Sequence, residues 1–425
     1  MVFVVSVAFG LDVSKATSQV VIMDHQTKVT SFKITNDLIG FNRVLDNLRE
    51  YQAPQIVFEA TGVYSRRVAR FFQLTGYRYT QLNPLAARKQ LDNFRHDKND
   101  RADAFNLAKT QLILHRAATF QQDPRYQELM DTSRAYQQAN EDFVRAKNRL
   151  HRVLQLTFPE LESLFKRPEG VLYWKLVHAF PHPAMVQTAQ KDLAQRIHTI
   201  VGQHMATKRI QQISQQLISF AQRSCPAVSE QSTDIEQVRY ETSEIIRLDA
   251  RKTTLIQKMV VIAKPLPELA ILTSIPGIAA TTAVLLIGEL GDIRRFRSSN
   301  CLNAYVGIDL HDHQSGKYAA QRHISKRGNT VARKVLFKTI GNIVSAARFR
   351  PCHIRDFYKT RKGQSPKPET KKIAIAAIHR LLRTIYHLIT HNQMYNYQVA
   401  KAKQLAAKKR RLKAQQRKAN PQQAK

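Results

Sequence analysis

VVSVAFGLDVSKATSQVVIM, residues 4–23, is the stretch of sequence that decides the fold. Residues 3–11 and 17–23 are two runs rich in β-branched side chains, and the DVSKA between them is short enough for a hairpin connection. Residues 29–34 (VTSFKI) alternate apolar and polar side chains, as a third strand does. We therefore expect an antiparallel hairpin followed by a third strand.

Helices and strands alternate after this start. The expected elements are helices at 37–51, 63–76 and 101–114, a buried strand at 55–60 (QIVFEA), and an extended segment that runs to Pro84. The resulting order, βββαβαβα, is the order of the ribonuclease H-like topology. We therefore expect an α/β domain over residues 1–120.

The remainder of the chain has a mostly helical pattern. Polar helical patterns at 126–158 and 229–264 favour antiparallel coiled-coil arms or a helical bundle, with Lys252 interrupting one heptad-like core position. Residues 165–228, between them, contain no motif. Residues 371–389 form an amphipathic helical pattern near the end of the chain. Four parts are expected: an α/β domain at 1–120, a helical or coiled-coil arm region at 121–265, an α-rich C-terminal domain at 266–395, and a basic tail at 396–425.

Charge indicates the class of partner. The 425 residues include 67 Lys and Arg against 32 Asp and Glu, a formal net charge of +35. The excess is uneven, because residues 1–60 are nearly neutral while residues 401–425 contain ten cations and no acid. Such a charge favours a polyphosphate partner, and the tail is expected to contact nucleic acid without sequence preference.

Compartment is indicated by what the sequence lacks. Cys225, Cys301 and Cys352 are too far apart for a disulfide framework or a CxxC metal site, which fits a reducing cytosol. The apolar start lacks a basic region and reaches an acid after eleven residues, so a strand is expected there instead of a signal peptide. No apolar run approaches a membrane span. A cytoplasmic, nucleoid-associated bacterial protein is the expectation.

Four acids stand where strands end or a helix begins. Asp12 follows the first strand, Glu59 ends a later one, and Asp100 and Asp103 lie three residues apart at a helix start. In the expected topology these positions meet at one edge of the sheet, where four carboxylates repel one another unless a divalent metal neutralises them. Two Mg²⁺ ions roughly 3.5–4 Å apart would polarise a phosphodiester at such a site. Taken singly, Asp12 could be a turn residue and Asp100 a helix cap.

An ordered set of short motifs resembles a known family. GLDVSK (10–15), FEATGVY (58–64), Asn83-Pro84 and KNDRADA (98–104) resemble the DEDD domain of insertion-sequence 110 family transposases. IPGI (275–278), Arg295-Phe296, AYVGI (304–308), QSG (314–316), SKRGN (325–329) and Arg333 are similar to that family's second domain. The resemblance covers roughly residues 5–160 and 268–390. GIDL at 307–310 departs from the family's more usual glycine–hydrophobic–x–proline.

The resemblance implies a mechanism. It implies a RuvC-like fold, Mg²⁺ bound by Asp12, Glu59, Asp100 and Asp103, and a nucleophilic serine at Ser315. It also implies a structured RNA, encoded by the element, that selects donor and target DNA.

The surroundings of Ser315 suit a phosphate but provide no obvious activating base. Gly316 permits close approach of the backbone, and the neighbouring cations are expected to contact nucleic acid: Lys317, Arg322, Lys326, Arg327 and Arg333. From the residues alone Ser315 would be an ordinary turn serine, and no Asp/His pair of triad type lies beside it. We expect the Mg²⁺ site to activate it in an assembled dimer or tetramer.

Three functions remain open at this point. The first is a transposase or recombinase that uses Ser315 and the four acids. The second is a Holliday-junction-type resolvase that uses the acids without the serine. The third is a non-enzymatic scaffold that binds structured RNA through its helical arms and basic tail.

Overall fold

The computed structural model describes residues 7–24, 27–84, 99–202, 205–311, 314–315, 318–319, 323–346, 349–364, 366–403 and 405–406. The chain divides into an N-terminal unit, residues 1–121, and a C-terminal unit, residues 122–425. Within the described residues, no helix combines the length and the apolar character needed to cross a bilayer.

A five-stranded mixed sheet forms the centre of the N-terminal unit. Its strands are β1 (Val7–Val13), β2 (Thr17–Asp24), β3 (Thr27–Thr35), β4 (Gln55–Glu59) and β5 (Tyr79–Leu82), in the spatial order β3-β2-β1-β4-β5. The pairs β1/β2 and β2/β3 are antiparallel, while β1/β4 and β4/β5 are parallel. The helices are α1 (Leu38–Arg49), α2 (Tyr64–Leu74) and α4 (Asp100–Leu114). The expected α/β domain with the order βββαβαβα is confirmed.

The two faces of the sheet are covered by different helices. Phe9 and Leu11 of β1 pack with apolar residues of α1 and α2 in one core. Ala8, their neighbour on β1, packs with Ala104 and Ala108 of α4 in another. Successive side chains of a strand alternate between faces, so β1 directs its even-numbered residues towards α4.

Gly10 lets α4 lie directly on β1. A Cβ atom at Gly10 would lie 2.1 Å from the carbonyl oxygen of Ala104 and 2.7 Å from the backbone nitrogen of Ala108. Any side chain here would therefore displace the helix. The glycine of GLDVSK sets the distance between strand and helix.

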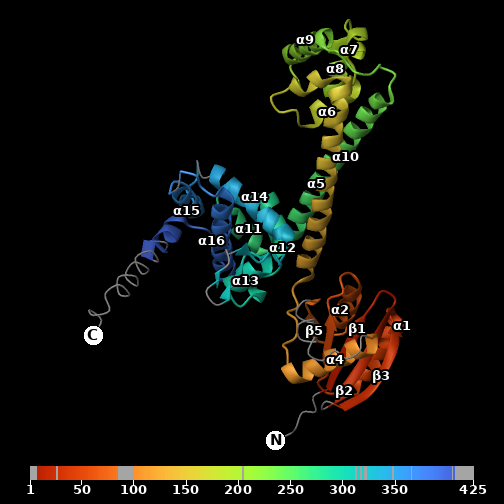
Figure 1. Ribbon diagram of the computed structural model, residues 1–425, viewed down its shortest axis with the longest axis vertical. Helices are drawn as coiled ribbons and strands as arrows, with labels where there is room; N and C mark the ends of the chain where they lie inside the picture. Colours follow the sequence, from red (N-terminus) through yellow and green to blue (C-terminus); the bar gives the residue numbers. More distant parts are fainter. Residues whose placement is uncertain are drawn as a thin grey trace, which may run out of the picture. The chain divides into compact units, whose positions relative to one another are not determined.

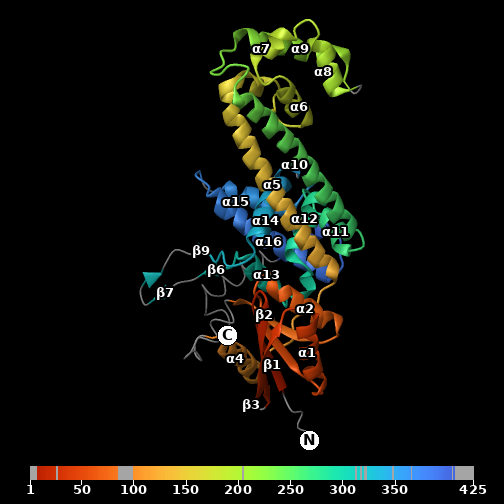
Figure 2. The same cartoon turned by 90° about the vertical axis from the view of Figure 1, so that its right-hand side faces the viewer.

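Two long helices form an arm in the C-terminal unit. They are α5 (Pro124–Thr157) and α10 (Thr233–Ala263), which lie side by side in both views (Figures 1 and 2). At 1.5 Å per residue, the 34 residues of α5 span about 50 Å. Lys252 does sit inside the arm: its ammonium lies 3.8 Å from the centre of the Phe143 ring, and burial lowers its pKa. A cation–π contact thus accommodates the residue that interrupts the heptad-like pattern.

A helical head closes the far end of the arm. Between the arm helices lie η2 (Pro159–Ser163), α6 (Val171–Ala179), α7 (Pro183–Thr188), α8 (Leu193–Val201) and α9 (Thr207–Arg223). Trp174, the only tryptophan, is buried in a core that also includes Leu150 of α5 and Ile245 of α10. The segment in which the sequence showed no motif is therefore a set of short packed helices.

The other end of the arm is rooted in a second helical group, which we call the platform. Its helices are α11 (Pro267–Thr273), α12 (Ala280–Leu290), η3 (Ile293–Arg295), α13 (Ser299–Val306), α14 (Thr330–Ala346), α15 (His353–Lys362) and α16 (Thr370–Thr390). Leu129 of α5 and Met259 of α10 belong to the platform's core. The helix expected at 371–389 is α16, and it buries Ile378, Leu382, Ile385 and Ile389 as its pattern predicts.

The IPGI turn is a packing element of the platform. Gly277 has φ +89°, and a Cβ atom there would lie 2.5 Å from the Cα of Ile343 in α14. Ile275 and Ile278 are both buried. The glycine therefore faces the backbone of a neighbouring helix, and the turn packs α12 against α14.

Candidate carboxylate site and serine hairpin

Two of the four acids lie at the carboxyl ends of neighbouring parallel strands, on the same face of the sheet. Leu11 of β1 is paired with Phe58 of β4, and Asp12 and Glu59 come directly after these two residues. Asp12 alternates with Gly10, which faces α4. Glu59 alternates with Val57, which packs against Leu107 of α4. Both carboxylates therefore lie at the carboxyl ends of their strands, on the α4 side.

The other two acids lie in the first turn of α4. The N-cap is Asn99, whose side-chain oxygen accepts a hydrogen bond from the backbone N–H of Ala102 at 2.8 Å. Asp100 and Asp103 then occupy the first turn, where the helix dipole favours negative charge. The alternative that Asp100 caps the helix is therefore wrong, because Asn99 has that role.

The electrostatics of Asp12 show that the four acids share one environment. Its pKa is raised to about 6, first by burial and then by the negative charges of Asp100, Asp103 and Glu59. Three neighbouring negative charges repel the ionised carboxylate of Asp12, and a bound cation would offset this repulsion.

The carboxylates do not form a closed coordination cage. Among the described residues, no three His, Cys, Asp or Glu side chains converge closely enough to hold a metal ion. Asp100, Asp103 and Glu59 nevertheless lie close enough to Asp12 for their charges to raise its pKa. These findings are compatible, because Mg²⁺ commonly uses only one or two carboxylates together with water and substrate phosphates.

Ser315 lies in a short antiparallel ladder. In the C-terminal unit β6 (Leu310–His311) pairs with β9 (His323–Ile324), and β7 (Gln314–Ser315) pairs with β8 (Tyr318–Ala319). Ser315 is opposite Tyr318, with two residues between them. Figure 2 shows β6, β9 and β7 on the same side of the platform, with β7 farther from the helices. The backbone of Ser315 is thus part of a short strand pair, where the residues alone suggest an ordinary turn serine.

The base of this hairpin is fastened to the platform. Ser325 N–H donates to the carbonyl of Asp309 at 2.9 Å, and the Ser325 hydroxyl donates to the Asp309 carboxylate. The ring of His379 in α16 contacts the carbonyl of Ile308 at 2.8 Å through Nε2. These contacts hold both strands of the hairpin where they leave the helices.

The predicted nucleic-acid contacts divide into three kinds. Lys326 and Arg327 are exposed, as a phosphate contact requires. Arg333 is half-buried and donates through Nη1 to the carbonyls of Val306 at 2.7 Å and Gly328 at 3.3 Å, so part of its guanidinium holds the fold together. Lys317, Arg322 and the side chain of Ser315 lie outside the described residues.

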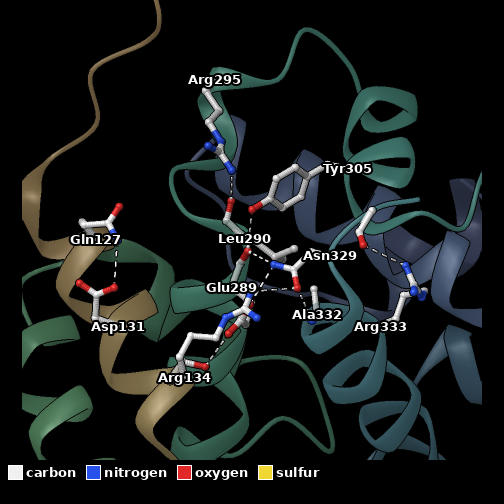
Figure 3. Close-up of polar contacts among 12 residues, drawn as sticks. Gln127, Asp131, Arg134, Glu289, Leu290, Arg295, Tyr305, Asn329, Ala332 and Arg333 are labelled. Carbon is white, nitrogen blue, oxygen red and sulfur yellow. Dashed lines mark hydrogen bonds and ion pairs between the residues drawn. The ribbon is translucent and has the colours of Figure 1, made fainter. Parts of the chain in front are cut away.

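A buried acid that the sequence analysis did not single out organises the SKRGN segment. Glu289 of α12 is fully buried and accepts hydrogen bonds from Ser133 at 2.9 Å, Arg134 at 2.8 Å and Asn329 at 2.8 Å. Figure 3 shows Arg134 and Asn329 converging on this carboxylate. An acid inside the apolar run LLIGELGD (285–292) is the sequence signal that could have identified it.

Asn329 performs a second task in the same network. Its side-chain oxygen accepts from the backbone N–H of Ala332 at 3.0 Å and so caps α14. Beside it Gly328 contacts the AYVGI segment, since a Cβ atom there would lie 2.2 Å from the carbonyl oxygen of Tyr305. The segments SKRGN and AYVGI are therefore packed backbone to backbone.

Family models match both units. The model described as a transposase, of the DEDD type in the IS110 group, matches residues 9–159, and the model described as "Transposase IS116/IS110/IS902 family" matches residues 269–359. The chain belongs to the IS110 family of transposases. In this IS110-family chain the first match includes all four acids, and the second includes Glu289, the serine hairpin and Asn329.

Two curated transposases share parts of the chain. The transposase for insertion sequence element IS1111A of Coxiella burnetii is 34% identical over 80 residues, 19% of this chain and 22% of that protein. The transposase for insertion sequence element IS1328 of Yersinia enterocolitica is 25% identical over 125 residues, 29% of this chain and 36% of that protein. The similarity thus spans about a fifth and about a third of the length of these relatives. Residues 160–268, which include the head, lie between the two family matches.

Proposed function

We propose that this protein is a DNA transposase that cuts DNA strands and rejoins them for the mobility of an insertion sequence. The observation that carries the proposal is the placement of the four acids, two at the carboxyl ends of neighbouring parallel strands and two in the first turn of α4. Burial and the three neighbouring charges raise the pKa of Asp12 to about 6, in agreement with this placement. Family membership supports a reaction at a phosphodiester. The mixed sheet order β3-β2-β1-β4-β5 supports a ribonuclease H-like (RuvC-like) N-terminal domain.

The four acids fit a divalent metal, and we assign Mg²⁺ to them. Their donor set consists of carboxylate oxygens, which hard cations prefer, and it carries negative charge without an enclosing cage. Asp12 and Glu59 would provide ligands from the sheet, and Asp100 and Asp103 would provide them from α4. When bound, Mg²⁺ polarises the phosphodiester and offsets the charge that develops on its oxygens.

Ser315 is the proposed nucleophile. Its Oγ attacks the phosphorus, the bond from phosphorus to the departing deoxyribose oxygen breaks, and a phosphoserine ester forms. The hydroxyl proton leaves to solvent or to a carboxylate, and the departing oxygen takes up a proton. The ester retains the free energy of the original linkage, so a second DNA end can displace the serine without an external energy source.

Partners follow from the same proposal. Two DNA partners, donor and target, must be held together, which favours an oligomer. The cationic platform and tail suit a structured guide RNA as well as DNA. We place the protein in the bacterial cytoplasm near the nucleoid.

The decisive experiment traps the covalent intermediate. Wild-type protein, incubated with donor and target DNA, Mg²⁺ and the element's RNA, is expected to form a denaturant-resistant protein–DNA adduct whose nucleotide maps to Ser315 by mass spectrometry. Ser315→Ala should bind DNA and form no adduct. Full strand exchange by Ser315→Ala would favour a resolvase that needs only the acids. Full strand exchange by an Asp12→Asn, Glu59→Gln double variant would exclude the acids from the reaction. RNA binding without any strand cleavage by the wild type would favour a scaffold.

A further inference from the structure

A small apolar pocket opens on the surface of the platform. It has a volume of about 210 Å³ and lies among α14, α15 and α16. Its lining includes Phe337, Gly341 and Val344 of α14, Tyr358 of α15, and Thr370 and Ala374 of α16. Apart from the hydroxyls of Tyr358 and Thr370, these side chains present only carbon. Pockets for drug-sized ligands usually measure about 300–1,000 Å³, so this one suits a single ring.

The pocket is kept open by a glycine that the backbone does not require. Gly341 lies in the middle of α14 with no positive φ, and a Cβ atom there would meet no heavy atom within 4 Å. Glycine inside a helix costs about 1 kcal/mol relative to alanine. Neither packing nor backbone conformation therefore explains why position 341 is a glycine. A molecule that occupies the space above Gly341 would explain it.

An aromatic side chain stands exposed at the edge of the pocket. Phe337 is 45% exposed although it lies one helical turn from Gly341. Tyr358 provides a second aromatic ring from a different helix. Aromatic rings that line an open pocket are suited to stacking on another planar ring.

Each of the three helices places a cation one turn from the pocket. Lys338 lies three residues before Gly341, Lys371 three before Ala374, and Lys362 four after Tyr358. All three lysines are exposed, and in the described part of the chain none lies within ion-pair distance of a carboxylate. The sequences of α14 and α16 contain no acid at all.

The acids of the surrounding segments already have partners. Asp356 of α15 accepts a hydrogen bond from the hydroxyl of Tyr397 at 2.8 Å, and Glu369 pairs with Lys372 at 2.7 Å. The rim of the pocket therefore carries a positive charge that a phosphate would offset.

We propose that this pocket receives one unpaired nucleobase of a DNA strand, with the flanking phosphates on Lys338, Lys362 and Lys371. A base has the flat, mostly apolar body that the pocket fits, and its backbone has the charge that the rim attracts. The proposal rests on the proposed function, because strand exchange on DNA leaves bases unpaired beside the cleaved linkage. An apolar side chain of a protein partner would fill the pocket but would leave the three lysines without anions.

Two DNA probes isolate the contribution of the base. The first is a duplex with a one-nucleotide bulge, and the second is the same duplex with an abasic residue in the bulge, so that the phosphates are identical. Binding of each to the full-length protein is measured by fluorescence anisotropy. We expect the base-carrying bulge to bind about 5- to 150-fold more tightly, the range that stacking of one base gives.

Variants of Gly341 test where that preference arises. Gly341→Leu fills the pocket and should bind both probes with the affinity of the wild type for the abasic probe. Gly341→Ala is the matched control, since it has the same advantage in helix propensity but leaves most of the space, and it should keep most of the preference. Lys338→Gln should lower the binding affinity for both probes by the same factor, because it removes a phosphate contact that both probes make.

The outcomes separate this inference from the proposed function. Equal affinity of the wild type for the two probes overturns the proposal that the pocket receives a base, and so does a preference that survives in Gly341→Leu. Neither result affects the predicted Ser315 adduct. A preference seen only with bulged RNA also overturns it, because the occupant would then not be DNA. A base preference without any adduct supports the pocket and overturns the serine chemistry.

Discussion

The side-chain amide of Asn329 donates to the buried carboxylate of Glu289 at 2.8 Å while its oxygen caps α14. One residue of the SKRGN segment thus satisfies a buried charge and begins the helix that follows it. Through Glu289 the same network reaches Ser133 and Arg134 at the foot of the arm. A buried acid therefore links the segment after the serine hairpin to the arm.

Asn329→Ala should destabilise the C-terminal unit by about 2–4 kcal/mol, because it removes a hydrogen bond to a buried charge and a helix cap together. Denaturant unfolding followed by circular dichroism measures the free energy of unfolding of the variant and of the wild type. The control is Lys334→Ala, which removes an exposed ion pair with Glu141 and should cost less than about 1 kcal/mol. Equal costs for the two variants would show that the Glu289 network does not hold the segment.

Gly10→Ala should move α4 off the sheet. Its methyl group would meet backbone atoms of Ala104 and Ala108, which cannot rotate away. Such overpacking costs about 1–3 kcal/mol, and the shift would carry Asp100 and Asp103 away from Asp12. We expect faster hydrogen exchange in α4 and loss of strand cleavage.

The control for this variant is Gly363→Ala. The nearest atom to a Cβ there is the carbonyl oxygen of Lys359 at 3.5 Å, an ordinary contact. Gly363→Ala should leave both exchange and cleavage unchanged. Unaltered cleavage in Gly10→Ala would separate the position of α4 from catalysis.

Local pattern was sufficient to predict the N-terminal unit and α16. The β-branched run in residues 17–23 and the helical spacing of Ile378, Leu382, Ile385 and Ile389 are properties of neighbouring residues, and tertiary packing agrees with them. The topology predicts that Asp12, Glu59, Asp100 and Asp103 lie at one edge of the sheet. The pKa of Asp12, which burial and the charges of the other three acids raise, agrees with that prediction.

Features that depend on distant partners were not predictable. Glu289 and Asn329 lie 40 residues apart and meet Arg134 of the arm, so their network exists only in the folded chain. The helices of the head are short, and their apolar residues form a core only with α5 and α10. The pocket above Gly341 requires three helices whose packing no single segment encodes.

His353 should make the platform sensitive to acid. It is buried, its Nδ1 lies 2.8 Å from the Tyr395 hydroxyl, and its Nε2 lies 3.3 Å from the Thr384 hydroxyl. Burial, with a smaller contribution from the nearby charge of Arg380, lowers its pKa to about 4, while Asp356 opposes this shift. The folded protein therefore favours the neutral ring.

The direction of the effect follows from the two pKa values. An unfolded histidine titrates near 6.5, so the stabilising contribution of neutral His353 is complete above that pH and is lost as the pH falls towards 4. Thermal unfolding between pH 7 and pH 4 should show a smaller loss of stability in His353→Gln than in the wild type. His198→Gln, which removes an exposed histidine of α8, should match the wild type. Parallel curves for all three proteins would exclude His353 as the source.

Asp12→Asn should separate metal binding from folding. Removing one of four like charges relieves the repulsion that raises the pKa of Asp12, so the metal-free variant should melt at the temperature of the wild type or above it. A ligand that binds only the folded state at 100 times its dissociation constant adds about 2.7 kcal/mol of stability. Mg²⁺ should therefore raise the melting temperature of the wild type and not that of Asp12→Asn.

The control is Asp46→Asn, which changes an exposed acid on α1 at the opposite face of the sheet and should respond to Mg²⁺ as the wild type does. An equal Mg²⁺-induced shift in Asp12→Asn would remove Asp12 from the metal site, and a shift in none of the three proteins would require DNA phosphates to complete the ligand set.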